Sequence, residues 1–294
     1  MELYTNLRKG EKGAWLSIAV YMLLSSTKYI VGYIGNSEAL RADGLNNFTD
    51  IIASVAVLIG LRISQKPPDD HHAYGHLRAE TISSLIAAFI MAIIGIQVVI
   101  QSFQSLMNPV QQAPSPITLF VGFGSAVVMY GVYRYNIALA RKIKSSALRA
   151  AAYDNRSDAF VSIGASIGII GAIVGFPILD SLTAFIVGVI ILYTAYGIFY
   201  DAAFTLSDGF NSEDAEALNV LVGKTPGVYQ VLDLKGRMHG NQAMIDVTVT
   251  VDPYLNVIES HWITEEIERK IHKAKPHALA LVHIEPEYDL IEHE

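Results

Sequence analysis

Six stretches of the chain are almost continuously apolar, and shorter polar or turn-forming stretches separate them. They cover about residues 14–34, 39–63, 81–106, 116–138, 147–174 and 179–203. Each approaches the roughly 20 residues that an α-helix needs to cross the hydrocarbon core of a membrane. The pattern therefore predicts a membrane domain over residues 1–205, an all-α bundle of six transmembrane helices.

The remaining residues, 206–294, are polar and charged and predict a separate α+β domain. Its expected elements are a helix, two strands, a helix and a strand over residues 212–224, 228–237, 243–251, 256–272 and 279–286. Ser212 is expected to cap the first helix, since acidic residues follow it in the first turn. The order α-β-β-α-β suggests a ferredoxin-like domain. Three strands leave an open sheet edge, so a second copy could cover it in a dimer.

Charge separates the two parts further. Residues 206–294 hold 16 Asp and Glu side chains against 7 Lys and Arg, whereas the whole chain has a formal net charge of −7. An acidic domain attracts cations, and no patch suited to nucleic acid is present. The chain contains no cysteine, which excludes disulfides and thiolate ligands. Any metal would therefore be held by oxygen and nitrogen atoms.

The basic residues set the expected orientation in the cell membrane. They lie before the first stretch and in the loops after the second and fourth, whereas the loops after the third and fifth carry no Lys or Arg. The positive-inside rule then places both termini in the cytoplasm. The first apolar stretch is too long for the core of a signal peptide, so we expect it to be a membrane span.

Two of the apolar stretches contain paired oxygen-bearing side chains four residues apart. Asn46 and Asp50 form one pair, and Asp154 and Asp158 the other. This spacing places each pair on one face of a helix. An Asp in mid-membrane costs about 2.5–3.5 kcal/mol, so such residues normally mark an ion path or a polar partner. The two pairs can converge as four ligands around one cation.

The same side chains could instead make polar contacts between helices. Asp154 lies near enough to the start of its stretch to be an interfacial carboxylate. Asp43, one turn before Asn46, fits a role in the ion path and a polar contact between helices equally well. Lys28 is expected to snorkel or to pair with a carboxylate. Around an empty site, carboxylates repel one another and hold protons, which a bound metal would displace.

At these residues the chain resembles the cation diffusion facilitators. Ala42 to Asp50 and Asp154 to Ala159 are similar to the paired transport-site motifs of that family, and Pro68 to Glu80 resembles its D-x-x-H-x-x-G-H loop. The resemblance covers nearly the whole chain. It implies a homodimer in the lipid membrane, not an enzyme, in which entering protons drive a divalent cation out by alternating access. No cofactor beyond the transported cation is implied.

The ligand types favour manganese. Zinc members of the family usually carry His or Asp at the position of Asn46, and many have a His at one of the four positions, whereas all four side chains here are oxygen ligands. Carboxylate and amide oxygens suit Mn²⁺, and the family members that this pattern resembles are the manganese-type exporters. Because an oxygen site can still bind zinc or iron more tightly, a Zn²⁺ or Fe²⁺ exporter is the alternative.

Two further metal sites are suggested by the same resemblance. The loop set comprises Asp69, His72 and His76, with His71 as an additional His; the alternative is a hydrogen-bonded loop with solvent-facing His. The tail set comprises Asp246, His261, His283 and Glu285. Leu232 and Thr248 stand where zinc members often have His, so a dinuclear zinc arrangement is incomplete. Metal in the tail would bridge two copies of the chain.

Two other classes of membrane protein fit the pattern less well. An intramembrane aspartyl protease needs a Gly-x-Gly-Asp context, which the sequence lacks. A non-transporting membrane metal sensor would depend on the tail, where the His set is incomplete while the membrane quartet is intact.

Overall fold

The computed structural model describes residues 2–64, 66–107, 113–143, 146–240, 242–276 and 278–287. The chain divides into two compact units. One comprises residues 1–56 and 86–198, and the other comprises residues 57–85 and 199–294.

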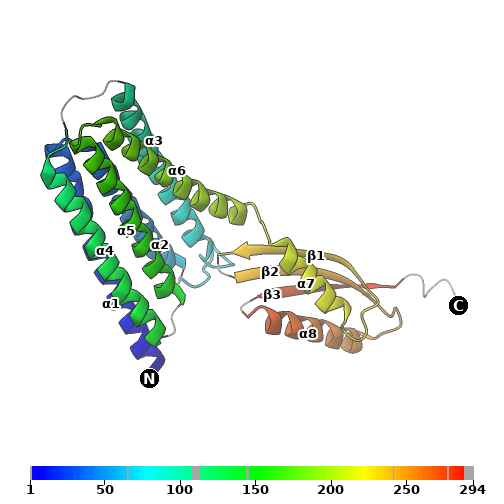
Figure 1. Cartoon of the computed structure of the whole chain (residues 1–294). Helices are drawn as coiled ribbons and strands as arrows, with labels where there is room; N and C mark the ends of the chain where they lie inside the picture. The colour runs from blue at the N-terminus through cyan, green and yellow to red at the C-terminus, as the bar shows by residue number, and fades with distance from the viewer. Residues whose placement is uncertain are drawn as a thin grey trace. The chain divides into compact units, whose positions relative to one another are not determined.

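Six long helices occupy the first part of the chain (Figure 1). They are α1 (Glu2–Ile34), α2 (Glu38–Ser64), α3 (Arg78–Met107), α4 (Pro116–Ile143), α5 (Ser146–Ile173) and α6 (Ile178–Leu206). Within the described residues, five of the six are long and apolar enough to cross a membrane, in segments of α1, α3, α4, α5 and α6. The exception, α2, carries charged side chains at Glu38, Arg41, Asp43, Asp50 and Arg62.

Some helix ends differ from the predicted ones. Helix α4 continues past Arg134 to Ile143, and α1 begins at Glu2 although the apolar run begins near residue 14. The residues at these ends include several strong helix formers, such as Arg, Lys, Leu and Ala. A drop in hydropathy therefore marks where a lipid-facing surface ends and does not mark where the helix ends.

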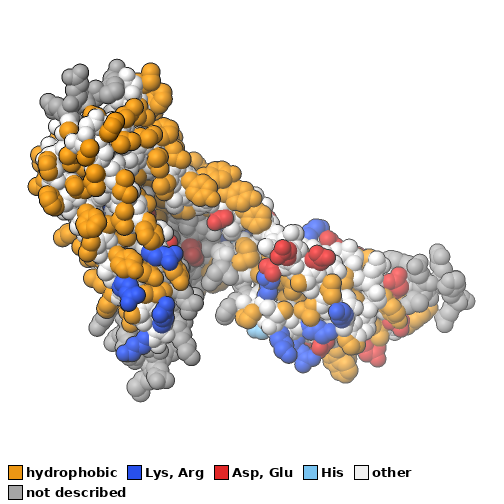
Figure 2. Space-filling view, viewed as in Figure 1, with side chains coloured by type: hydrophobic (Ala, Val, Ile, Leu, Met, Phe, Trp, Pro, Cys, Tyr) orange, Lys and Arg blue, Asp and Glu red, His pale blue; other side chains and the backbone are white. Residues whose placement is uncertain are grey.

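Four helices meet in one apolar cluster beside the polar residues of α2 and α5. Tyr21 and Leu24 of α1 pack there with Ile51 of α2, Met129 of α4 and Ala159 of α5. Helices α1, α4 and α5 are in direct contact. The outward-facing side chains of this unit are largely hydrophobic, as the orange surface in Figure 2 shows. Such a surface is suited to lipid.

Close approach of α1 and α2 depends on Gly44. A Cβ atom at this position would lie 2.9 Å from the backbone nitrogen of Tyr29. Small residues commonly allow such approach between membrane helices. Gly44 thereby lets the polar side chains that flank it on α2 reach across to α1.

The second unit contains the tail domain, in the predicted order of elements. These are α7 (Ser212–Gly223), β1 (Gln230–His239), β2 (Gln242–Val251), α8 (Val257–Ala274) and β3 (Leu279–Pro286). Strand β2 is central; it pairs antiparallel with β1 and parallel with β3. Because parallel strands need a crossover connection, α8 lies between β2 and β3 in the chain.

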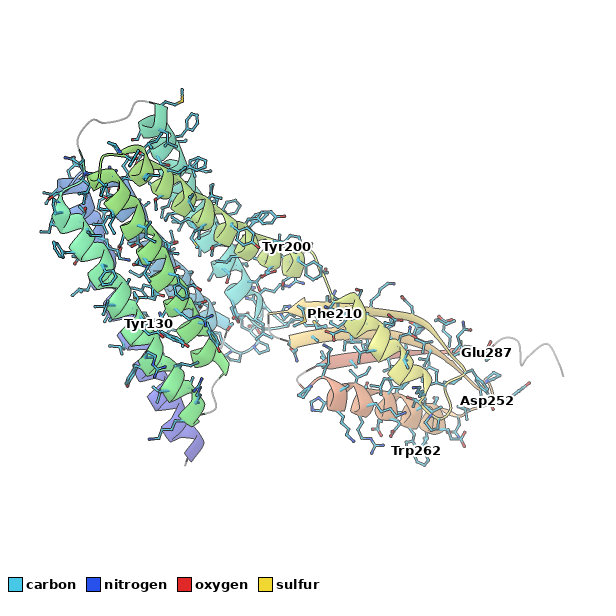
Figure 3. The ribbon with its side chains drawn as sticks, viewed as in Figure 1. Tyr130, Tyr200, Phe210, Asp252, Trp262 and Glu287 are labelled. Atoms are coloured by element: carbon cyan, nitrogen blue, oxygen red, sulfur yellow. The ribbon has the colours of Figure 1, made fainter. Side chains whose placement is uncertain are left out.

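One face of this sheet forms the tail core. Ile245, Val247 and Val249 of β2 are buried with Ile267 and Ile271 of α8. The alternate residues of β2 face the other way, as the predicted two-residue period requires. The outer side of α8 is exposed, as Trp262 shows in Figure 3.

The predicted cap of the first tail helix was wrong. Asn211 caps α7, since its side chain accepts hydrogen bonds from the backbone nitrogens of Glu213 and Asp214 at 2.8 and 3.1 Å. Asn and Ser are comparably good caps, so composition alone did not separate the neighbours. Strand β1 begins at Gln230, two residues after its predicted start, because Val228 belongs to a turn that includes Gly227 at φ +89°.

Candidate metal-transport site

Helices α2 and α5 bring the two predicted pairs toward each other. The Asn46 amide nitrogen donates to Oδ1 of Asp158 at 3.2 Å. Both side chains are largely buried, at 7% exposure each. One residue from each i, i+4 pair is thus in direct contact across the two helices.

The other two predicted ligands are arranged differently. Asp50 is half-buried, and its Oδ2 is buried without a hydrogen-bond partner among the described residues. Asp154 is exposed. Among the described His, Asp and Glu side chains, the three aspartates do not bring their oxygens within 4.8 Å of one another. Asp50 nevertheless lies close enough to Asp154 and Asp158 for their charges to interact.

Sequence reasoning missed the second partner of Asp158. Tyr21 of α1 donates from its hydroxyl to Oδ2 of Asp158, and Asn155 donates to the Tyr21 oxygen at 2.9 Å. Asn155 in turn accepts from Ser17 and Asn136, at 3.3 and 3.1 Å. Both oxygens of Asp158 are therefore held by side chains. The sequence did not indicate Tyr21 as a partner, because it lies within an apolar run. Asn136, a lone Asn in α4, could have been predicted to make a polar contact between helices.

Asp43 makes no hydrogen bond to Asn46 or Asp158 among the described residues. It forms an ion pair with Lys28, with 2.8 Å between Nζ and Oδ2. Of the two expectations for Lys28, pairing with a carboxylate is confirmed.

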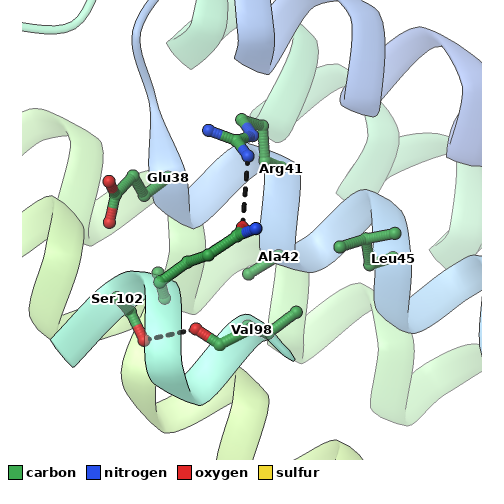
Figure 4. Close-up of a pocket in the computed structure, with 8 residues that line it drawn as sticks. Glu38, Arg41, Ala42, Leu45, Val98 and Ser102 are labelled. Carbon is green, nitrogen blue, oxygen red and sulfur yellow. Dashed lines mark hydrogen bonds between the residues drawn. The ribbon is translucent and has the colours of Figure 1, made fainter. Parts of the chain in front are cut away.

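The N-terminal end of α2 is fixed to its neighbours by polar contacts. The Asp180 carboxylate of α6 accepts from the Ser37 hydroxyl at 2.7 Å and from the Glu38 backbone nitrogen at 2.5 Å. Arg41 donates to Gln101 of α3 at 3.3 Å, beside a small pocket shown in Figure 4. The residues that line this pocket are Glu38, Arg41, Ala42, Leu45, Val98, Gln101, Ser102 and Ala184. None of the four predicted ligands lines it, so it is separate from the metal-transport site.

The predicted loop set does come together. The ligand atoms of Asp69, His72 and His76 lie within 4.8 Å of one another. Nδ1 of His72 is 3.0 Å from Oδ1 of Asp69, and Nε2 of His76 is 3.4 Å from Oδ2. Oδ1 of Asp69 also accepts hydrogen bonds from the backbone nitrogens of His71 and His72, which closes the turn. The hydrogen bond from His72 holds the pKa of Asp69 below its ordinary value.

Changing His72 to Ala is expected to weaken metal binding by the loop. The variant loses a ligand, and the pKa of Asp69 rises toward its ordinary value, so protons compete with metal at a higher pH. We expect Co²⁺ affinity to fall by about tenfold or more, measured from visible absorption in a titration between pH 5 and pH 7. The control is His71→Ala, in the same turn but outside the cluster. Equal losses in the two variants would contradict a site built on Asp69, His72 and His76.

The predicted tail set is not brought together within one chain. His261 lies beside Glu265, with 3.4 Å between Nε2 and Oε1. His283 lies on β3 beside Glu285 at 3.8 Å. Asp246 is on the sheet face that points away from the core, whereas α8 packs on the core face. The sheet therefore separates His261 from Asp246 in a single copy.

Comparison with known families matches both parts of the chain. Residues 14–207 match the cation efflux transmembrane domain. Residues 210–287 match the cytoplasmic domain of cation efflux proteins.

Similar individual proteins cover nearly the full length. The manganese efflux system protein MneS of Bacillus subtilis (strain 168) is 51% identical over 97% of this chain and 99% of its own. An uncharacterized transporter of the same strain, YdbO, is 50% identical over 98% of this chain and 99% of its own. A solved structure of the MamB CTD magnetosome protein from Desulfamplus magnetovallimortis BW-1 covers 26% of this chain and 95% of its own, at 21% identity and a TM-score of 0.25.

Proposed function

This chain belongs to the cation efflux, or cation diffusion facilitator, family, and we propose that the divalent cation it exports is Mn²⁺. As a member of that family it is a metal cation efflux transporter and not an enzyme. Its long apolar helices make it a multi-pass membrane protein.

The choice of manganese rests on the contact between Asn46 and Asp158. It unites an amide and a carboxylate from two helices at 3.2 Å. With Asp50 and Asp154 these residues supply only oxygen ligands, which suit Mn²⁺ better than the imidazole-containing sites that suit zinc. The similarity to a protein that is itself called a manganese efflux protein supports the same choice.

The contacts of Asp158 suggest how metal is taken up and released. In this structure Asn46 donates its N–H group to Asp158, which leaves its amide oxygen available to a metal. Tyr21 donates to the other Asp158 oxygen and orients the carboxylate. Since metal competes with protons for the three aspartates, binding on one side releases protons and release on the other side takes them up. This exchange gives an H⁺ antiporter without a separate proton relay.

We also propose how the chain is arranged in the membrane and how two copies associate. We assign α2 as the sixth transmembrane helix, because it holds two of the four ligands. The transmembrane domain then covers residues 1–205, with both termini in the cytoplasm. Residues 206–294 form a ferredoxin-like domain that joins two copies into a homodimer, with the open edge of β1 or β3 available to the partner.

Deletion of the gene tests the choice of metal. We expect the mutant to be sensitive to Mn²⁺ and to accumulate it, measured by growth on graded metal and by elemental analysis of washed cells. Expression of the wild-type chain restores both, and the empty vector is the control. Unchanged manganese together with raised zinc or iron would replace the Mn²⁺ assignment with the corresponding alternative.

A further inference from the structure

A charged pair is fully buried in the helical unit, outside the predicted metal ligands. Lys28 of α1 and Asp43 of α2 each have 0% side-chain exposure, and Nζ lies 2.8 Å from Oδ2. A buried ion pair usually stabilises a fold no better than apolar residues of similar size. In a helix bundle that faces lipid, its presence therefore indicates a role beyond packing.

The ammonium group of Lys28 lies against three oxygen atoms, one in an ion pair and two in hydrogen bonds. Besides Asp43, it donates to Oδ1 of Asn47 at 2.7 Å and to the hydroxyl of Ser162 at 2.8 Å. Ser162 donates onward to Oδ1 of Asp43 at 3.2 Å. We call these four residues the ion-pair cluster. It joins α1, α2 and α5, and its formal charges cancel.

The ion-pair cluster lies directly beside the metal-transport site. Asp43 is three residues before Asn46 on α2, and Ser162 is four residues after Asp158 on α5. One helical turn therefore separates the cluster from a predicted ligand on each helix. Both charges of the pair act on the site, since Lys28 interacts with Asp50 and Asp158, and Asp43 interacts with Asp158.

We propose that Lys28 and Asp43 are a positioning pair that sets the electrostatic potential at the metal-transport site. Asp43 cancels an ammonium charge that would otherwise repel a divalent cation. Lys28 in turn offsets the negative charge that Asp43 places beside the three aspartates. The site then binds a cation tightly enough to load it and weakly enough to release it. This inference rests on the proposed transport function.

The charge role makes predictions of opposite sign for the two residues. Lys28→Met removes a positive charge near the site, so Mn²⁺ affinity should rise by roughly tenfold or more and turnover should fall as release slows. Asp43→Asn leaves the ammonium charge uncompensated, so affinity should fall by roughly tenfold or more. The double variant carries neither charge, and its affinity should return to within about threefold of wild type.

The experiment measures Mn²⁺ binding to the purified full-length chain in lipid nanodiscs at pH 8, where protons compete least. The concentration of free Mn²⁺ is read from its electron paramagnetic resonance signal. The Mn²⁺ binding that is lost in the Asp158→Ala variant is the part that occurs at the metal-transport site. Ser162→Ala is the matched control, because it removes two hydrogen bonds of the cluster without changing its charge. We expect that variant to keep wild-type affinity.

A purely structural role gives a different result. Lys28→Met, Asp43→Asn and Ser162→Ala would all weaken binding, and the double variant would be no better than the single ones. That outcome, or unchanged affinity in all four, would overturn the proposal. If Lys28→Met does not fold, Asp43→Asn and the double variant still decide between the two roles. Absence of Asp158-dependent binding in the wild type would instead contradict the proposed transport function.

Discussion

Replacing Asp158 by Ala is expected to abolish metal transport while the helices stay folded. Asp158 is the residue on which the contacts of α1, α2 and α5 converge, since it accepts from Asn46 and from Tyr21. Loss of an outer-shell partner typically costs roughly 10- to 100-fold in metal affinity or activity, and loss of a ligand should cost more. We therefore expect Mn²⁺ flux in proteoliposomes to fall by more than about a hundredfold.

The control for this variant is Asp201→Ala. Asp201 is the same residue type on a long helix, α6, but it is exposed and lies far along the chain from the predicted ligands. It should transport at the wild-type rate. Circular dichroism and gel filtration should show that both variants fold. Substantial transport by a folded Asp158→Ala protein would remove the four-ligand site from consideration.

Replacing Asn46 by His is expected to shift the preference of the transporter from manganese toward zinc. The imidazole supplies a nitrogen ligand next to Asp158, and nitrogen ligands favour Zn²⁺. We expect the ratio of zinc to manganese transport to rise by about tenfold or more. The ratio is measured with each metal in turn, in the same proteoliposomes.

Asn46→Asp is the matched comparison for metal preference. It keeps an all-oxygen site but adds a charge and introduces a residue type that zinc members also carry here, so we expect a smaller shift toward zinc than in Asn46→His. An unchanged ratio in Asn46→His would mean that Asn46 does not contact the transported metal. An equal shift in both variants would mean that charge, and not the ligand atom, determines the choice.

Periodicity and spacing predicted most of the secondary structure. The six apolar stretches lie in six helices, and the strict alternation of β2 gave the orientation of its side chains. These features depend on residues near one another in sequence, where local geometry dominates. The cap of α7 was misplaced by one residue, since Asn211 and Ser212 are equivalent by propensity.

The contacts between helices could be predicted only in part. The i, i+4 rule placed each pair on one face of its helix, and Asn46 and Asp158 do meet. Lys28 was expected to snorkel or to pair with a carboxylate, and it pairs with Asp43. The partner Tyr21 could not be identified, because its position facing Asp158 depends on how α1 packs. Asp154 remains exposed for a similar reason: helical spacing fixes its face on α5 but does not fix its distance from α2.

The loop set and the tail set also differ in how far local sequence determines their geometry. Asp69, His72 and His76 lie within eight residues, and a single turn brings them together. The tail set is spread over β2, α8 and β3, so its geometry depends on which face of the sheet each element occupies. Motif matching identified these positions but could not show that the sheet separates His261 from Asp246.

The most direct measurement is Mn²⁺ flux into proteoliposomes of the purified chain, with and without an imposed proton gradient, followed together with the internal pH. We expect Mn²⁺ to accumulate against its own gradient only when protons can flow outward, and to do so in the wild type but not in Asp158→Ala. Flux that is independent of the proton gradient, or equal in the two proteins, would contradict proton-coupled manganese export through this site.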